Sequence, residues 1–371
     1  MQAQTRQQNK LQMALDELKA RKLTMEQVRR VAVERTGDIH IEVHEAGLQR
    51  FFVYKAGELQ ELWPQEDSKI PLALKLANDK FAGGHMIISY RPGRRIVLGP
   101  MAGEQGHIIK GFRKRRAAHA AGLYATAISV CEQTGFDIPG LLQYIRKDDC
   151  LVMARRSGQP PELDDGSVET WSEIGSSLRQ FQNTSRLPEL TVGLPDFGHL
   201  DELAVLDERA RRLLLCVPDL PGRWLSGRQR LESAAMDLPP DVAGLTHRDL
   251  HDGQFIVSGN TISLLDFDLL CLADVALDAG NLLAHMKLRE LQGRAGVDGA
   301  SVSACEEAFL SGLGRQDEPG FEQHLLFYKA TCFYRLALLY SLRPRWQHLT
   351  EALIGLGAQC IGALGDLKAG S

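Results

Sequence analysis

The sequence has no long hydrophobic run and no surplus of positive charge, and these two absences exclude large classes of protein. No apolar stretch reaches the roughly 20 residues that a membrane-spanning helix requires, and the polar N-terminus MQAQTRQQNK lacks the apolar segment of a secretory signal. We therefore expect a cytoplasmic protein without a membrane span. A formal net charge of −4 argues against a nucleic-acid partner.

Clustered cysteines are also lacking. The seven cysteines are odd in number and never arranged as CxxC, so they predict reduced thiols and neither a disulfide framework nor a zinc site. They are scattered along the chain at positions 131, 150, 216, 271, 305, 332 and 360. The sequence gives no indication of the oligomeric state.

The length of 371 residues exceeds one ordinary core, so we expect two or three structural units. Residues 1 to about 36 carry apolar side chains at helical spacing and predict two amphipathic helices that are broken near Lys22. Three short strand-like segments with tight connections, Met86–Tyr90, Arg95–Leu98 and His107–Phe112, then predict an antiparallel sheet. After a helical segment, residues 141–145 and 150–154 predict a hairpin.

A linker is indicated at Ser157-Gly158-Gln159-Pro160-Pro161, which holds two prolines and a glycine. The sequence beyond it is mostly helical in pattern, with one helix over Val168–Gln182 whose Gly175 allows close packing. The predicted division is an N-terminal extension over residues 1–80, a mainly β segment over 81–156 and a mainly helical segment over 157–371.

Two polar clusters flank a predicted hairpin in residues 245–268, LTHRDLHDGQFIVSGNTISLLDFD. Asp249 follows an apolar approach, where a carboxylate can accept a proton from a substrate hydroxyl. Gln254 offers an amide oxygen, and Asp266 adds a carboxylate after the second strand. Such oxygen ligands suit Mg²⁺, which proteins hold through one or two carboxylates together with substrate phosphates.

Each of these residues has a simpler explanation when it is taken alone. Asp249 can be a turn residue, Gln254 a surface amide and Asp266 a cap at a strand end. Their order around one hairpin favours the metal and phosphate site. Lys110 lies inside an apolar strand, and composition alone favours a lysine that points to solvent.

These motifs carry a resemblance. HxDxxxxQ over residues 247–254, followed by Asp266-Phe267-Asp268, resembles the aminoglycoside phosphotransferase and choline kinase-like family, a bacterial phosphotransferase family with the protein-kinase fold. The same residues are similar to the HRD and DFG pairs of protein kinases. The resemblance extends from about residue 86 to 346. It implies a bilobal α+β fold with a small antiparallel β N-lobe for nucleotide binding, a larger mainly helical C-lobe and an N-terminal extension.

The resemblance also implies ATP and Mg²⁺ as cofactors and a small-molecule hydroxyl as acceptor. In this family the residue at Asp249 would be the catalytic base, and those at Asp266 and Gln254 would be metal ligands. His247 and Asp278 would support the catalytic loop without taking part in the chemistry.

The nucleotide-binding residues follow from the same resemblance. Lys110 would pair with the α- and β-phosphates, which reverses the solvent-facing interpretation of this lysine. Gly93 and Arg94 occupy the turn of the first hairpin, near the phosphates. Ala154 would lie at the hinge and contact adenine through backbone groups.

Three departures from the family keep an alternative open. Gln254 stands where most members have Asn, and the helical segment 113–130 has no acidic residue to pair with Lys110. A GxGxxG loop is also missing. The alternative is a kinase-fold pseudoenzyme that binds a nucleotide or a partner for regulation. A protein kinase is a poorer interpretation, because no APE-like segment follows Asp268.

The acceptor is not identified by the sequence. The family includes kinases of sugars, choline-like alcohols, homoserine and antibiotics, and the acceptor pocket would be formed by residues 281–346. Candidate polar side chains in or near this region are Asp274, His285, Glu290, Glu306 and Glu307.

Overall fold

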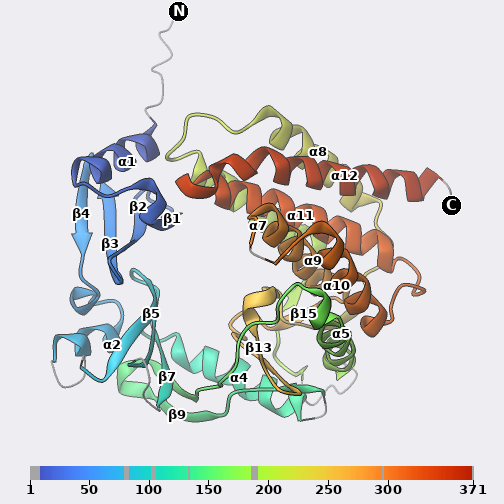
Figure 1. Ribbon diagram of the computed structural model, residues 1–371, viewed down its shortest axis with the longest axis horizontal. Coiled ribbons are helices and arrows are strands. Elements are labelled where there is room, and N and C mark those ends of the chain that lie inside the picture. Colours follow the sequence, from blue (N-terminus) through green and yellow to red (C-terminus); the bar gives the residue numbers. More distant parts are fainter. Residues whose placement is uncertain are drawn as a thin grey trace, which may run out of the picture. The chain divides into compact units, whose positions relative to one another are not determined.

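The computed structural model divides the chain into two compact units, each made of discontinuous segments (Figure 1). The first unit comprises Met1–Leu62, Gly198–Pro240 and Glu322–Ser371, and the second comprises Trp63–Phe197 and Asp241–Phe321. The residues described are 9–78, 83–101, 106–132, 134–184, 191–294 and 296–369. Among them, no helix combines the length and apolar character needed to cross a membrane.

The first unit combines an N-terminal sheet with helices from two later parts of the chain. Four strands form an antiparallel meander in sequence order, β1 (Val28–Val33), β2 (Ile39–Glu45), β3 (Leu48–Lys55) and β4 (Glu58–Leu62). The helices are α1 (Lys10–Ala20), α7 (His199–Leu213), α8 (Gly222–Met236), α11 (Phe321–Ser341, from Glu322 on in this unit) and α12 (Thr350–Ala369).

The second predicted N-terminal helix is wrong, because Val28–Val33 is strand β1. Val28 and Val31 are both buried at a spacing of three, which imitates one face of a helix. The register with β2 shifts between Val28 and Arg30, so a β-bulge returns these two valines to the same face. The first predicted helix, found as α1, is confirmed.

The second unit contains a five-stranded antiparallel sheet, which joins the three-stranded sheet and the hairpin that the sequence predicts. Its order is β5 (His85–Arg91), β6 (Arg95–Pro100), β7 (His107–Phe112), β10 (Cys150–Ala154) and β9 (Leu141–Ile145). Helix α4 (Ala117–Cys131) packs against β9 and β10. Tyr124 of α4 donates a hydrogen bond to the Pro139 carbonyl at 2.7 Å, which fixes the helix beside the sheet.

Two small sheets hold the stretch 245–268 at both ends. The predicted hairpin is confirmed as β13 (Phe255–Ser258) and β14 (Thr261–Leu264), and β14 also pairs with β8 (Phe136–Asp137). The approach to the predicted catalytic loop is β12 (Ala243–Thr246), which pairs with β15 (Cys271–Asp274), and β15 pairs in turn with β11 (Asp196–Phe197).

Three helices complete the second unit: α5 (Val168–Asn183), α9 (Ala276–Leu291) and α10 (Gly299–Leu313). Helices α5 and α10 lie side by side (Figure 1). Trp171 and Phe181 of α5 are fully buried, and they contact Phe255 and Phe136, respectively, edge to face. The predicted linker is tied to β13 by two backbone hydrogen bonds between Gln159 and Val257.

The seven cysteines are all buried and free, in agreement with the prediction of reduced thiols. Burial raises the pKa of the Cys131 and Cys216 thiols to about 12, so these side chains remain protonated at neutral pH.

Candidate active site

The loop after β12 is held at its entry by a carboxylate from the first turn of α9. The backbone N–H groups of His247 and Arg248 each donate to Asp278 at 2.7 Å, one to each carboxylate oxygen. Burial raises the pKa of Asp278 to about 6, although His247 and the two N–H donors oppose the change. The Asp278 side chain therefore aligns two successive peptide groups just before Asp249.

Arg248 turns the loop outward. Its φ of 71° lies in the left-handed region, which is uncommon for a residue with a side chain and often marks functional loops. The guanidinium carbon lies 3.6 Å from the centre of the Phe197 ring, and the Arg248 carbonyl accepts a hydrogen bond from Asn281 at 3.0 Å. These contacts leave Asp249, the next residue, exposed to solvent and available to a substrate.

His247 joins this loop to the end of β14. Its Nε2–H donates to the Leu265 carbonyl at 2.7 Å, and its Nδ1 accepts the Asp249 N–H at 3.4 Å. The ring is fully buried and contacts Phe267 at 5.4 Å between centroids. His247 thus fixes the position of Asp249 relative to Asp266, the residue that follows Leu265.

Four charged side chains meet at Asp266-Phe267-Asp268. Lys110 Nζ lies 2.8 Å from an oxygen of Asp266 and 2.6 Å from one of Asp268. Arg95 lies 2.8 Å from the second oxygen of Asp268 and 3.5 Å from that of Asp266. Lys110 is buried, with 8% of its side chain exposed, and its burial requires these opposite charges.

Asp268 stands in for the acidic residue that α4 does not have. No acidic side chain occurs in Ala117–Cys131, and α4 instead places the ring of Tyr124 against Phe267 at 5.8 Å, edge to face. Both carboxylates that pair with the lysine therefore come from the segment that also carries the predicted metal ligand. Spacing along the sequence did not reveal that Asp268 is a partner of Lys110.

Asp266 remains ionised in this environment. Burial by itself would raise its pKa, but the charges of Lys110 and Arg95 outweigh burial and hold the pKa well below its usual range. The φ of Asp266 is 63°, a second left-handed residue at the site. An ionised carboxylate is a ligand type that Mg²⁺ accepts, and in this structure Lys110 and Arg95 each engage one oxygen of Asp266.

Gln254 lies beside Asp266 because its carbonyl accepts the Leu265 N–H at 2.9 Å. Its side-chain amide is buried, 3.3 Å from His251 Nε2. His251 Nδ1 accepts the Gly253 N–H at 3.0 Å, so a neutral ring carries its proton on Nε2. The structure places the amide nitrogen of Gln254 toward His251 Nε2, and the amide oxygen would accept from a proton on Nε2 only after a 180° turn of the amide.

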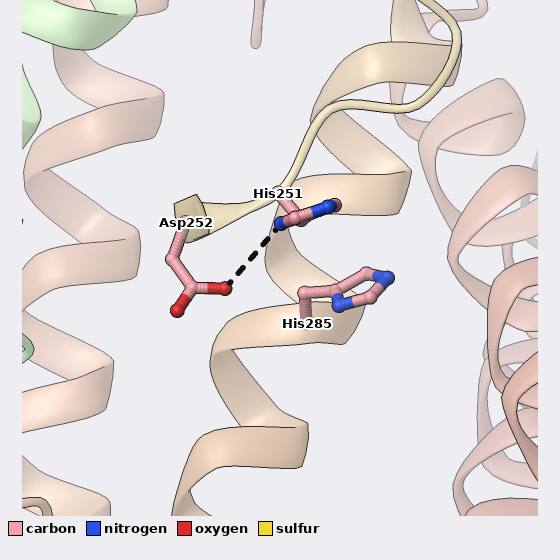
Figure 2. A group of neighbouring side chains, drawn as sticks. All are labelled: His251, Asp252 and His285. Carbon is pink, nitrogen blue, oxygen red and sulfur yellow. Dashed lines mark ion pairs between the residues drawn. The ribbon is translucent and has the colours of Figure 1, made fainter. Parts of the chain in front are cut away.

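His251, Asp252 and His285 form a second cluster next to the loop (Figure 2). The His251 and His285 rings stack at 5.0 Å, and His251 lies 3.8 Å from Asp252. Burial would raise the pKa of Asp252, but Arg289 keeps it below its usual range, with contacts of 2.8 to 3.1 Å. Since Arg294 also approaches at 3.5 Å, the carboxylate is neutralised by arginines and does not favour a cation site.

The predicted nucleotide contacts lie at two ends of the sheet. Gly93 has a φ of 66°, and its N–H donates to Asp67 at 2.6 Å, while the Arg94 N–H donates to the Arg91 carbonyl. The Ala154 N–H donates to the Gly140 carbonyl at 2.9 Å. These three backbone donors are therefore already used, and contacts to a nucleotide there would come from carbonyl groups or side chains.

Two of the acceptor-pocket candidates have structural partners. Asp274 accepts the N–H groups of Val242 and Ala276 at 3.0 and 2.8 Å, and Glu290 lies 2.6 Å from Lys287. Asp274 thus holds the ends of β12 and α9 and is a poor candidate for binding an acceptor.

The comparisons with known proteins agree with this geometry. A model of the phosphotransferase enzyme family matches residues 110–317, more than half of the chain. No curated protein matches the sequence significantly.

Solved structures give the fold. A choline/ethanolamine kinase family protein from Mesorhizobium loti is 16% identical, with a TM-score of 0.54, over 78% of this chain and 97% of its own. Choline kinase from Cryptosporidium parvum is 10% identical, with a TM-score of 0.54, over 81% and 95%. An amicoumacin kinase in complex with AMP-PNP, Ca²⁺ and Ami is 14% identical, with a TM-score of 0.53, over 79% and 93%.

At these identities the likeness concerns the fold alone, and it confirms the kinase-like α+β fold expected from the sequence. The enzyme class comes from the family model, whose match begins at Lys110 and includes the whole predicted catalytic stretch. The chain belongs to the phosphotransferase enzyme family.

Proposed function

We propose that this protein is an ATP- and Mg²⁺-dependent small-molecule kinase that transfers the γ-phosphoryl group to a hydroxyl of a small metabolite, sugar or antibiotic-like acceptor. The observation that carries the proposal is the meeting of Lys110 with Asp266 at 2.8 Å, in the unit where Asp278 and His247 position an exposed Asp249. The neighbours of similar fold include an amicoumacin kinase and a choline kinase, which supports an alcohol acceptor.

In the proposed reaction, the acceptor oxygen forms a bond to the γ-phosphorus as the bond from this phosphorus to the β,γ-bridging oxygen breaks, and ADP leaves. Asp249 orients the hydroxyl and takes its proton. Lys110 neutralises the phosphates of the nucleotide. Asp266 and Gln254 would hold Mg²⁺, which supplies further neutralisation of the phosphate charge.

The test is nucleotide turnover with a panel of hydroxyl compounds, comparing the wild type with Asp249→Asn. Loss of the base should lower kcat by about 10²- to 10⁴-fold, because general-base catalysis contributes that much, while binding of Mg²⁺-ATP stays close to the wild type. Asp165→Asn is a matched control, since Asp165 is an exposed aspartate of the second unit. Turnover that is insensitive to Asp249→Asn would contradict the assignment of the base.

A second candidate is a kinase-fold regulatory module that binds nucleotide without transferring phosphate. The contact between the Gln254 amide and His251 favours it, because this contact uses part of a predicted metal ligand. Calorimetric titration with Mg²⁺-ATP distinguishes the two candidates: tight binding without turnover on any acceptor supports the regulatory module.

A further inference from the structure

Three cationic side chains share one face of the five-stranded sheet. Arg91 of β5 is paired directly with Arg95 of β6, and Lys110 of β7 is paired directly with Val97 of β6. Directly opposed residues project to the same face, and so do residues two apart along a strand. Arg91, Arg95 and Lys110 therefore all project toward the side where Asp266 and Asp268 lie.

The two carboxylates that contact this face are already paired with other cations. Asp266 and Asp268 are both engaged by Lys110 and Arg95. Among the residues that the structure describes, Arg91 has no carboxylate in ion-pair distance, and its Nε is buried without a hydrogen-bond acceptor. Like charges that are directly opposed across strands destabilise a sheet, and a buried donor without an acceptor destabilises the protein further. A bound anion would relieve both effects.

The backbone of the hairpin turn is not available to supply the missing phosphate contacts. The N–H of Gly93 is bound by Asp67, which also accepts from Tyr90 at 2.9 Å. The N–H of Arg94 closes the turn onto the Arg91 carbonyl at 2.9 Å. A glycine-rich loop would direct such N–H groups at phosphates, whereas in this turn they stabilise the protein itself.

The surroundings of Arg91 identify which part of a nucleotide it faces. Burial lowers the pKa of Arg91 and the neighbouring Arg95 lowers it further, while the carboxylates of Asp266 and Asp249 oppose both effects. Arg91 is paired across the strands with Arg95, whose guanidinium lies 3.5 Å from Asp266, so Arg91 lies beside the predicted metal ligand, and the charge of the predicted base also reaches it. In phosphoryl transfer, the group that passes between these two residues is the terminal phosphate.

We infer that Arg91 binds the terminal phosphate of a nucleoside triphosphate and thereby selects the triphosphate over the diphosphate. This inference rests on the proposed function. The planar guanidinium can donate two parallel hydrogen bonds to phosphate oxygens, and it stays charged at any physiological pH. In this chain Arg91, on strand β5, thus makes the phosphate contact that the N–H groups of a glycine-rich loop make in other proteins.

The experiment compares binding of ADP and of a non-hydrolysable ATP analogue, each with Mg²⁺, by calorimetry on the full-length protein. The variants are Arg91→Met, Arg91→Lys and the control Arg146→Met, which replaces an exposed arginine at the β9–β10 turn of the same sheet. Arg91→Met should weaken binding of the analogue by roughly 10- to 100-fold, the value of a charge-assisted hydrogen bond, and binding of ADP by less than about threefold. Arg91→Lys should be intermediate, and Arg146→Met should match the wild type.

Equal losses for the analogue and ADP with Arg91→Met, or no loss for either, would overturn the inference while leaving the proposed function intact. Failure of the wild type to bind either nucleotide would overturn both. Melting temperatures of all variants are measured first. If Arg91→Met is unfolded, Arg91→Lys decides, because it keeps the charge and loses only the paired donors.

Discussion

Lys110 owes its position to two carboxylates that are separated by a single residue. Because Asp268 lies 2.6 Å from Lys110 and 2.8 Å from Arg95, its removal leaves two or more cations facing Asp266 alone. We expect Asp268→Asn to destabilise the protein. Lys110→Met should destabilise the Asp268→Asn variant less than it destabilises the wild type. A double-mutant cycle should give a coupling of about 1–3 kcal/mol between Lys110 and Asp268, measured by denaturant unfolding.

An exposed ion pair provides the control for this cycle. Arg223 and Glu351 are 66% and 60% exposed and lie 3.4 Å apart, so their coupling should be below about 1 kcal/mol. Coupling of Lys110 and Asp268 at this lower level would mean that the lysine is positioned by Asp266 and not by Asp268.

The candidate site was largely predictable at the level of residue types, because its chemistry depends on a few groups in a fixed order. His247, Asp249, Gln254 and Asp266 occur within 20 residues along the chain, and the hairpin between them is signalled by Gly259-Asn260. The partners of Lys110 were not predictable in the same way. They lie 156 and 158 positions away, and only the tertiary fold brings them together.

At the scale of elements, the packing of α5 on α10 depends on two glycines. A Cβ at Gly312 would lie 2.0 Å from the Ser172 carbonyl oxygen, and one at Gly175 would lie 2.1 Å from that of Phe309. Both obstacles are backbone atoms, which can move only if the helices separate. The sequence anticipated close packing at Gly175 but not the reciprocal glycine on α10.

Gly312→Ala should therefore destabilise the protein by about 1–3 kcal/mol, the usual effect of inserting a methyl group into a well-packed contact. Gly122 of α4 is the matched control, because nothing lies within 4 Å of the Cβ position. Gly122→Ala should stabilise by up to about 1 kcal/mol through helix propensity. Thermal unfolding of both variants checks the pair, and equal effects would show that helix propensity outweighs packing.

Strand β1 marks the limit of periodicity as a guide to elements. The pattern of Val28 and Val31 fits a helix and a bulged strand equally well, and pairing with β2 decides between them. The β-branched content of Val28–Val33 was the available signal. In the five-stranded sheet, the pairs β5–β6, β6–β7 and β9–β10 were predicted correctly because short turns make them local, whereas the pairing of β7 with β10 across α4 was not predicted.

At the scale of the whole molecule, the sequence could not predict that the first unit is discontinuous. Residues 1–62 fold with Gly198–Pro240 and Glu322–Ser371, and the Leu11 N–H donates to the Cys216 carbonyl at 3.1 Å. Arg35 reaches Glu208 of α7 at 2.9 Å. Contacts over such separations depend on the fold, and composition along the chain carries no sign of them. The predicted boundaries at residues 80 and 156 stay predictions.

Because the first unit is made of three separate segments of the chain, deletion of residues 1–62 tests how these segments depend on one another. Leu11, Leu15 and Leu18 are buried, so the deletion would remove apolar partners and expose surface that is otherwise covered. We expect faster amide hydrogen exchange in α7, α8 and α12 and a lower melting temperature, whereas α5 and α10 of the second unit should exchange as in the intact chain. Unchanged exchange of α7, α8 and α12 after the deletion would contradict this expectation and would mean that residues 1–62 form an independent appendage.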